Sequence, residues 1–305
     1  MKRDISREAA GSGTAREASR DAVLEPGLYV VATPIGNLGD ITRRALEVLG
    51  HAAFVAAEDT RVTRGLLHHY GIGAKLVAVH EHNELRVAGS IVEAIAAGDA
   101  VALVSDAGTP AVSDPGAVVV QRVREAGQRV IPVPGASALT AAISASGLTF
   151  EGIVFAGFLP VKGSARRKRL EALAAGPWAV ALFESPHRIA GTLADLHAAL
   201  GERGVVIARE ITKKFETIER MPLAAARAWI EADPDRERGE FVLVIEGRAV
   251  EAAPAIDWHA VLDALLEELP LKQAVALAVR ITGAPRNELY AAALERKDAA
   301  PKRKA

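Results

Sequence analysis

The segment 104–116 combines residue types that could bind a cationic small molecule, since it reads Val-Ser-Asp-Ala-Gly-Thr-Pro-Ala-Val-Ser-Asp-Pro-Gly. An apolar run, 100–104, precedes it and a helical pattern, 117–126, follows it. Aspartates can face positive charge, glycines let a ligand approach the backbone, and prolines reduce the entropy lost on binding. The segment therefore predicts a preorganised binding loop. For Asp106 and Asp114, capping of the next helix is an alternative role.

Further loops rich in glycine, proline or hydrogen-bonding side chains follow other apolar runs, at 33–37, 58–61, 80–84 and 132–137. In open α/β sheets, ligands bind at the carboxyl ends of the strands, so these loops should line one edge. None of them is a Gly-x-Gly-x-x-Gly or Walker loop, which gives a nicotinamide or nucleoside-triphosphate cofactor little support. A ligand without phosphates, such as S-adenosyl-L-methionine, fits these loops better.

The elements that carry these loops alternate between short apolar strands and helices. Strands are expected at 27–32, 54–57, 76–79, 101–104 and 130–133. Helices are expected at 40–49 (with Asp40 as its cap), 61–70, 84–97, after Pro115, and at 137–146. This alternation predicts a mostly parallel α/β domain over residues 26–147.

The pattern changes at about residue 148, where strands are no longer always separated by helices. Strands are expected at 153–158, 178–184, 205–211, 216–221 and 241–246, with helices at 168–175, 189–200 and 223–232. The sequence therefore predicts a second α/β domain, 148–249, with a mixed sheet. A small helical domain is expected over 255–297, flanked at the chain ends by a disordered tail over 1–25 and a basic tail over 298–305.

Composition excludes several classes of protein. The formal net charge of −1 over 305 residues removes bulk electrostatics as an argument for nucleic-acid binding, so RNA contact would need a local basic patch. The absence of cysteine excludes disulfides, thiolate nucleophiles and Cys-ligated zinc. Glycines and prolines interrupt the apolar stretch 131–161, and the N-terminus has no secretory h-region, so we expect a cytoplasmic protein without a membrane span.

An ordered set of motifs resembles the bacterial 16S ribosomal RNA cytidine 2′-O-methyltransferases of the tetrapyrrole-methylase superfamily. The motifs are Thr33-Pro34-Ile35-Gly36-Asn37-Leu38, Ala57-Glu58-Asp59-Thr60-Arg61, His80-Glu81-His82-Asn83-Glu84, the segment 104–116, Pro132-Val133-Pro134-Gly135, Ser146-Gly147-Leu148, Gly157-Phe158-Leu159-Pro160, Glu184-Ser185-Pro186-His187-Arg188, Arg209-Glu210-Ile211-Thr212-Lys213 and Gly239-Glu240-Phe241. The resemblance covers about residues 27–248, and the helical end with Asn287-Glu288-Leu289-Tyr290 also looks like that family.

This resemblance implies two α/β domains with S-adenosyl-L-methionine in the cleft between them, and a homodimer that methylates a cytidine near the decoding site. The partner would be 16S ribosomal RNA or the small ribosomal subunit. The implied cofactor-binding residues are Pro34, Gly36, Ser105, Asp106, Gly108, Thr109, Pro110, Asp114, Pro115 and Ser137. Two alternatives stay open: the same fold methylating a tetrapyrrole or other small molecule, and a non-enzymatic ribosome-assembly protein.

Methyl transfer to a ribose hydroxyl needs help for a poor nucleophile, either from a base or from a cation that lowers its pKa. Candidates for proton handling are Glu184, His187 and Glu58, although Glu184 could instead pair with Arg188 across a turn. Glu210 also follows a strand of the second domain and belongs among the cleft candidates.

Candidates for RNA contact are basic residues of the loops and of the run 162–169, for which a solvated helix face is the alternative. They are Arg61, Lys162, Arg166, Arg167, Lys168, Arg188 and Lys213. The His80-Glu81-His82 triplet does not predict a metal, because successive side chains diverge and no third ligand has a useful spacing.

Overall fold

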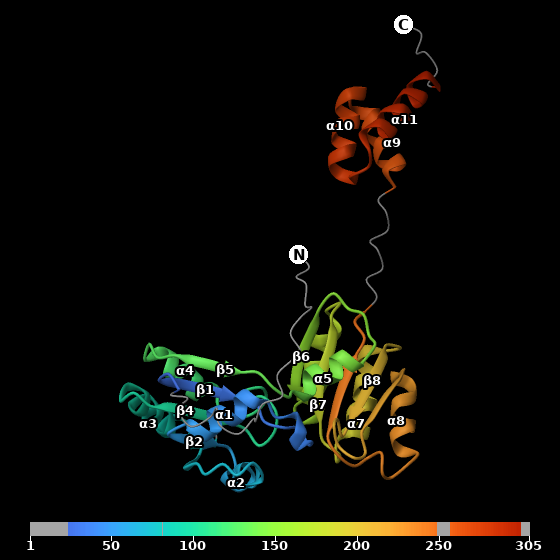
Figure 1. Ribbon diagram of the computed structural model, residues 1–305. Helices are drawn as coiled ribbons and strands as arrows, with labels where there is room; N and C mark the ends of the chain where they lie inside the picture. The colour runs from blue at the N-terminus through green and yellow to red at the C-terminus, as the bar shows by residue number, and fades with distance from the viewer. Residues whose placement is uncertain (1–23, 81, 249–256, 300–305) are drawn as a thin grey trace, which may run out of the picture. The chain divides into compact units, whose positions relative to one another are not determined.

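The computed structural model describes residues 24–80, 82–248 and 257–299 (Figure 1). The chain divides into two compact units, 1–248 and 249–305. Most of the predicted N-terminal and basic tails lies outside the described residues. Two parts of those predictions need correction. Leu24 packs against the first sheet and Glu25 pairs with Arg129, whereas residues 298 and 299 belong to the last helix.

The first sheet is entirely parallel, as predicted, with the strand order β3-β2-β4-β1-β5. Its strands are β1 (Gly27–Val31), β2 (Phe54–Ala57), β3 (Leu76–Ala78), β4 (Ala100–Val104) and β5 (Val130–Val133). Its helices are η1 (Leu38–Asp40, a short 3-10 turn), α1 (Arg43–His51), α2 (Thr60–His69), α3 (Glu84–Ala96) and α4 (Ala117–Glu125). Since the strands run in one direction, the loops that follow them meet at one edge of the sheet.

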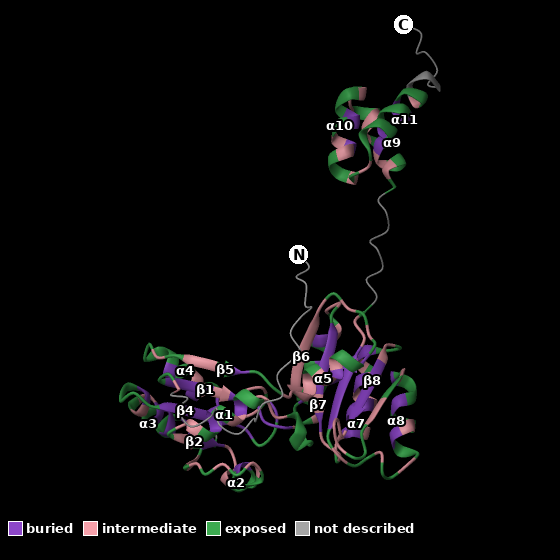
Figure 2. Cartoon of the chain, in the orientation of Figure 1, coloured by how far each residue is buried: buried purple, intermediate pink, exposed green. Residues whose placement is uncertain are grey.

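Apolar side chains cover both faces of this sheet. One core joins Val31 and Val55 to Val48 and Leu49 of α1, and the other joins Leu103 to Ile91 of α3. Burial on both faces explains why the strands are continuous apolar runs instead of alternating ones. Figure 2 shows the buried residues concentrated along the strands.

The second sheet is mixed, as predicted, with the order β6-β7-β10-β8-β9 and only β6 and β7 parallel to each other as neighbours. Its strands are β6 (Ile153–Phe158), β7 (Ala179–Glu184), β8 (Gly204–Arg209), β9 (Thr217–Pro222) and β10 (Phe241–Ile245). Helices α6 (Gly163–Ala174), α7 (Ile189–Leu200) and α8 (Leu223–Glu231) pack on one face. Helix α5 (Ala138–Ala145) follows β5 in the chain but packs on the other face through Ala142, beside Val206 and Val242.

The predicted cap at Asp40 is wrong, and the alternative role of Asp114 as a cap is not found either. Thr42, and not Asp40, caps α1 by accepting a hydrogen bond from the Ala45 amide at 3.1 Å. The start of α4 is capped by the buried carboxylate of Glu84, which accepts hydrogen bonds from the amides of Gly116 (2.6 Å) and Val118 (3.2 Å). Asp114 is therefore not the cap of α4, because a residue on α3 already satisfies these amides.

The second unit is a three-helix bundle of α9 (Trp258–Glu268), α10 (Leu271–Thr282) and α11 (Arg286–Ala299). Its core holds Leu262, Val275 and Leu289, and Gly283, in the left-handed conformation, ends α10. Among the residues that the structure describes, no helix is both long and apolar enough to cross a membrane.

Candidate active site

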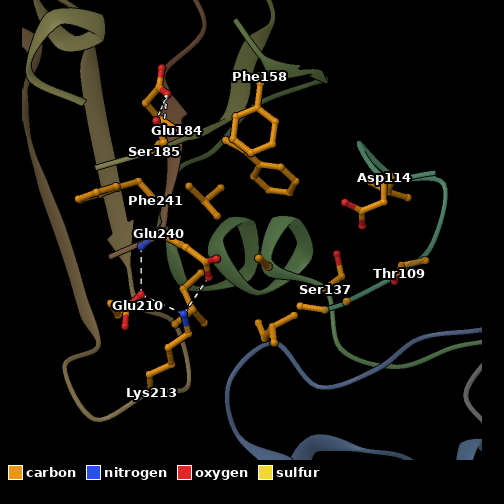
Figure 3. Close-up of a pocket in the computed structure, with 18 of the residues that line it drawn as sticks. Thr109, Asp114, Ser137, Phe158, Glu184, Ser185, Glu210, Lys213, Glu240 and Phe241 are labelled. Atoms are coloured by element: carbon orange, nitrogen blue, oxygen red, sulfur yellow. Dashed lines mark hydrogen bonds and ion pairs between the residues drawn. The ribbon is translucent and has the colours of Figure 1, made fainter. Parts of the chain in front are cut away.

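A cavity of about 350 Å³ lies where loops of the first sheet meet loops of the second (Figure 3). From the first sheet, the loops after β1, β4 and β5 contribute Ile35, Ala107, Gly108, Thr109, Val112, Asp114, Ser137 and Ala138. From the second sheet come Phe158, Phe183, Glu184, Ser185, Pro186, Glu210, Ile211, Lys213, Glu240, Phe241 and Val242. The predicted loops therefore do converge, and the volume is in the range of small-molecule sites.

The loop after β4 is held in a constrained conformation against the loop after β1. Thr33 and Gly108 exchange backbone hydrogen bonds of 2.8 and 3.0 Å. Gly108 has φ of +76°, and a Cβ atom there would lie 3.3 Å from Ile35 Cγ2. Ala111 and Ser113 adopt positive φ values of 65° and 69° although they are not glycines. Such conformations cost about 1–3 kcal/mol each and are typical of ligand-binding loops.

Carboxylates gather beside this loop, but only some of them face the cavity. Asp114 lines it, and burial raises its pKa, partly opposed by a hydrogen bond with Ser105. Asp106 is not in the lining; its Oδ1 accepts a hydrogen bond from the Asp59 amide at 2.9 Å. Burial also raises the pKa of Glu58, which accepts from the Asp106 amide at 3.4 Å. Asp106 and Glu58 thus join the loops after β2 and β4.

Glu184 is buried, with only 2% of its surface exposed, and both of its carboxylate oxygens accept hydrogen bonds. It accepts hydrogen bonds from the Ser185 amide (2.7 Å) and the Thr192 hydroxyl (2.6 Å), and it pairs with Arg188 Nε at 3.4 Å. Arg188 in turn donates to the Leu159 carbonyl at 2.6 Å. This is the structural pairing that the sequence left as an alternative. Glu184 lines the cavity within this network, and its role as the base stays a prediction.

The other predicted bases do not border the cavity. His187 is exposed on the turn before α7. Glu58 accepts a hydrogen bond from the Asp106 amide and is outside the cavity lining. Neither side chain is within the lining of the described cavity, so their role in proton handling stays a prediction from the sequence.

Lys213 is the one cationic side chain among the described residues that line the cavity. Its Nζ contacts Glu210 Oε1 at 2.9 Å and Glu240 Oε2 at 2.8 Å. Gly36 makes room for the lysine, since a Cβ atom at Gly36 would lie 2.8 Å from Lys213 Cε and closer still to Cγ. Lys213, predicted as a residue that contacts RNA, is thus held at the cavity wall between two carboxylates.

The loop that carries Lys213 is also strained and tied to the first sheet. Glu210 and Thr212 have positive φ values of 51° and 65°. The Thr212 hydroxyl donates a hydrogen bond of 2.6 Å to Asp40 Oδ2. Glu240 was not among the predicted site residues, although the Gly239-Glu240-Phe241 motif contained the signal that could have pointed to it.

Of the predicted cofactor residues, Gly108, Thr109, Asp114 and Ser137 line the cavity. The remainder are Pro34, Gly36, Ser105, Asp106, Pro110 and Pro115, which are outside the lining. Pro34, Ser105 and Pro110 are buried within the loops that form the first wall. The sequence missed the apolar part of the wall, which includes Ile35, Val112, Phe158 and Phe183.

The predicted RNA-binding residues differ in their surroundings. Arg166 forms an ion pair of 2.6 Å with Asp195 and only 17% of its side chain is exposed, so its assignment to RNA needs correction. Lys162, Arg167 and Lys168 are exposed at the start of α6. Arg61 is 83% exposed and pairs with Asp59 at 2.6 Å, which lowers the pKa of Asp59 to about 2.

No group of three or more His, Cys, Asp or Glu side chains suited to a metal ion is found within residues 24–80, 82–248 and 257–299. Glu81, the central residue of the His-Glu-His triplet, lies outside the described residues.

Comparison with known proteins connects this geometry to a family. The model of the Tetrapyrrole (Corrin/Porphyrin) Methylases matches residues 27–227, and that of the RsmI C-terminal HTH domain matches residues 252–297. A protein of Pseudomonas aeruginosa named Ribosomal RNA small subunit methyltransferase I is 50% identical over 88% of this chain and 97% of its own length. Its namesake in Escherichia coli O157:H7 is 49% identical over 88% of this chain and 94% of its own length.

Solved structures agree on the fold. The methyltransferase CobJ superposes with a TM-score of 0.54 at 21% identity, over 73% of this chain and 95% of that chain. A uroporphyrin-III C-methyltransferase from Thermus thermophilus, complexed with S-adenosyl homocysteine, has a TM-score of 0.50 at 20% identity, over 72% of this chain and 97% of that chain. With two sheets, a cleft between their loops and relatives of nearly full length, the chain belongs to the tetrapyrrole methylase family and, within it, to the small-subunit ribosomal RNA methyltransferases I.

Proposed function

We propose that this protein transfers a methyl group from S-adenosyl-L-methionine to the ribose 2′-oxygen of a cytidine in 16S ribosomal RNA, near the decoding site. The observation that carries the proposal is the cavity itself. One wall is the loop after β4, with Gly108 and residues at positive φ. The opposite wall, from the second sheet, carries Lys213 in an ion pair with Glu210. Relatives that are about 50% identical to this chain are named as ribosomal RNA methyltransferases, which supports ribosomal RNA as the substrate. The small-molecule and non-enzymatic alternatives have no such support.

The lining residues suit S-adenosyl-L-methionine chemically. The Asp114 carboxylate can face the methionine ammonium, and the Thr109 and Ser137 hydroxyls can bond to polar groups of the cofactor. Ile35, Val112 and Ala138 offer apolar surface for an adenine ring. Gly108 keeps the loop open, since a side chain at its positive φ would be strained and would press on Ile35. When bound, the cofactor supplies the electrophilic methyl group.

The chain's own contribution to the reaction is alignment and control of a proton. Displacement at a methyl carbon requires the attacking oxygen, the carbon and the sulfur in line, and such positioning can supply several kcal/mol. We assign control of the ribose hydroxyl to Lys213, whose ammonium is held between Glu210 and Glu240 at the cavity wall. The ammonium would stabilise the developing alkoxide, and Glu240, with 80% of its side chain exposed, could accept the proton.

Contact with the RNA is assigned to Lys162, Arg167 and Lys168 on the first turns of α6. Among the described residues, none of these side chains forms an ion pair, so their charge is available to phosphates. The helix-turn-helix match of the second unit suggests an additional RNA contact. Because the net charge is only −1, binding should rest on such local patches and weaken with added salt. We further propose a homodimer that acts in the cytoplasm, where ribosomal subunits assemble.

The test is transfer of radiolabelled methyl from S-adenosyl-L-methionine to small ribosomal subunits and to bare 16S RNA, both from cells lacking this modification. Digestion to nucleosides identifies the product. Label on the ribose of cytidine is the expected result, and a comparison of the substrates shows which form is recognised. Label on a base, or no label on either substrate by a protein that binds the cofactor, would contradict the proposal.

A further inference from the structure

The Phe158 ring is a large apolar side chain that remains half exposed at the cavity, with 53% of its surface accessible. Single exposed apolar residues are common on proteins, so the exposure alone has little meaning. Its position is more informative. Phe158 ends β6, and Figure 3 shows its ring on the side of the second sheet, with Asp114 and Thr109 on the loop of the first.

The backbone holds this ring in place through an irregularity of the strand. The pairing of β6 with β7 shifts register between Phe155 and Phe158. Gly157, inside the shift, has φ of +61°, and a Cβ atom there would lie 3.2 Å from Ser113 Oγ. Bulges of this kind redirect side chains and are frequent beside active sites. The irregularity therefore brings β6 close to the cofactor-side loop and turns Phe158 toward the cavity.

A second aromatic ring supports Phe158 from behind. Phe158 and Phe183 pack edge to face, with centroids 5.7 Å apart and an interplanar angle of 61°. Phe183 is itself packed against Phe155 at 5.0 Å. Edge-to-face packing is a preferred arrangement of two aromatic rings, and the 53% exposure of Phe158 leaves much of its ring accessible. Phe158 is thus the exposed member of a cluster of three packed aromatic rings at the cavity.

Positive charge follows directly along the chain. Phe158 is only four residues from Lys162, a span of at most about 14 Å, and Arg167 and Lys168 lie on the helix that begins there. An aromatic face beside exposed cations matches a nucleotide, whose base stacks while its phosphates contact the basic side chains. A base inside a duplex has both faces covered, so this pairing fits a nucleotide that has left the stack.

We propose that Phe158 is a stacking platform for the base of the nucleotide that receives the methyl group, which must be turned out of its stack to enter the cavity. This inference rests on the proposed function. Stacking on Phe158 would hold the ribose at a fixed distance from Lys213, so that the 2′-oxygen faces the methyl group. The ring contributes orientation and has no part in the proton transfer.

The experiment compares kcat/KM for methylation of small subunits by the wild type, Phe158→Ala, Phe158→Leu and Phe158→Trp. Cofactor affinity and melting temperature are measured for each. Stacking on an aromatic side chain predicts a loss of about tenfold or more in kcat/KM for the alanine variant. The leucine variant, with apolar bulk but no aromatic face, should stay impaired, and the tryptophan variant should recover most of the activity. All should bind S-adenosyl-L-methionine like the wild type.

Phe215→Ala is the matched control, because Phe215 is 62% exposed but is outside the cavity lining. It should leave kcat/KM unchanged. Three results would each overturn the stacking role while leaving the proposed function intact. They are wild-type activity of Phe158→Ala, equal activity of the leucine and tryptophan variants, and a loss of cofactor affinity that parallels the loss of activity. Absence of ribose-methylated cytidine with the wild type would instead overturn the proposed function, and the platform with it.

Discussion

Replacing Gly36 by alanine should displace the Lys213 side chain and lower the rate of methyl transfer while leaving the fold intact. The added Cβ atom would lie 2.8 Å from Lys213 Cε and closer still to Cγ, which is below any normal carbon–carbon contact. Gly36 has φ of +154°, a conformation that favours glycine. Because the clash is with a flexible side chain and not with backbone, the lysine should move to another rotamer, away from Glu210 and Glu240.

The expected magnitudes differ for stability and for catalysis. The two ion pairs of Lys213 are partly exposed, so their loss should cost about 1 kcal/mol or less in the free energy of unfolding. Strain at residue 36 adds a cost of about 1 kcal/mol. By contrast, removal of a group that stabilises a developing negative charge typically lowers kcat by about 10²-fold or more. The variant should therefore melt only slightly below the wild type and lose most of its turnover.

The assay is single-turnover methylation of small subunits at saturating cofactor, with unfolding followed in parallel. Lys213→Met should reproduce the kinetic loss without the clash at residue 36. Gly73→Ala is the matched control, since a Cβ atom at Gly73 would meet no heavy atom within 4 Å. Wild-type turnover in either Gly36→Ala or Lys213→Met would refute the assignment of Lys213 to the ribose hydroxyl.

Three further predictions concern other parts of the site. Asp114→Asn should weaken S-adenosyl-L-methionine binding about tenfold or more, as loss of a charged hydrogen bond predicts, and calorimetry measures it. Since burial raises the pKa of Asp114, its ionised form is lost as the pH falls through a value above the ordinary 3.8. Wild-type affinity should therefore decline with acidification earlier than for an exposed aspartate, and the asparagine variant should lack this component. The same raised pKa makes the carboxyl's contribution to stability largest at acidic pH and diminishing as the pH rises through that value. The double variant Arg167→Glu, Lys168→Glu should bind small subunits more weakly in filter binding, with a smaller dependence of affinity on salt and an unchanged cofactor affinity. Arg166→Ala removes the ion pair with Asp195 and should chiefly lower the melting temperature. Glu184→Gln should lower the free energy of unfolding by about 1–3 kcal/mol in denaturant titrations while retaining methyl transfer per folded molecule. Complete loss of turnover in a stably folded variant would instead identify Glu184 as a catalytic residue.

The order of the strands and helices could be predicted from the sequence because local patterns specify them, although the helix expected at 168–175 begins at residue 163 and the strand expected at 205–211 ends at residue 209. The apolar run before residue 104 forms β4, and the glycine–proline segment after it forms a constrained loop. Parallel strands then place the loops after β1, β4 and β5 at one edge, so the first wall of the site was predictable in outline. The ordered motifs also pointed to the family that the relatives confirm.

The partner of each charged side chain was decided by tertiary structure alone. Glu84 caps α4 by accepting a hydrogen bond from the Gly116 amide, 32 residues later, and Arg166 pairs with Asp195, which is 29 residues away. Lys213 enters the cavity because Gly36, in the loop after β1, leaves space for its side chain. Sequence patterns report backbone preference and burial, whereas the availability of a carboxylate or an ammonium depends on which distant groups pack beside it. For this reason the sequence identified the loops of the site, and only the folded chain showed that Glu184 bonds to Thr192 and that Lys213 lies between Glu210 and Glu240.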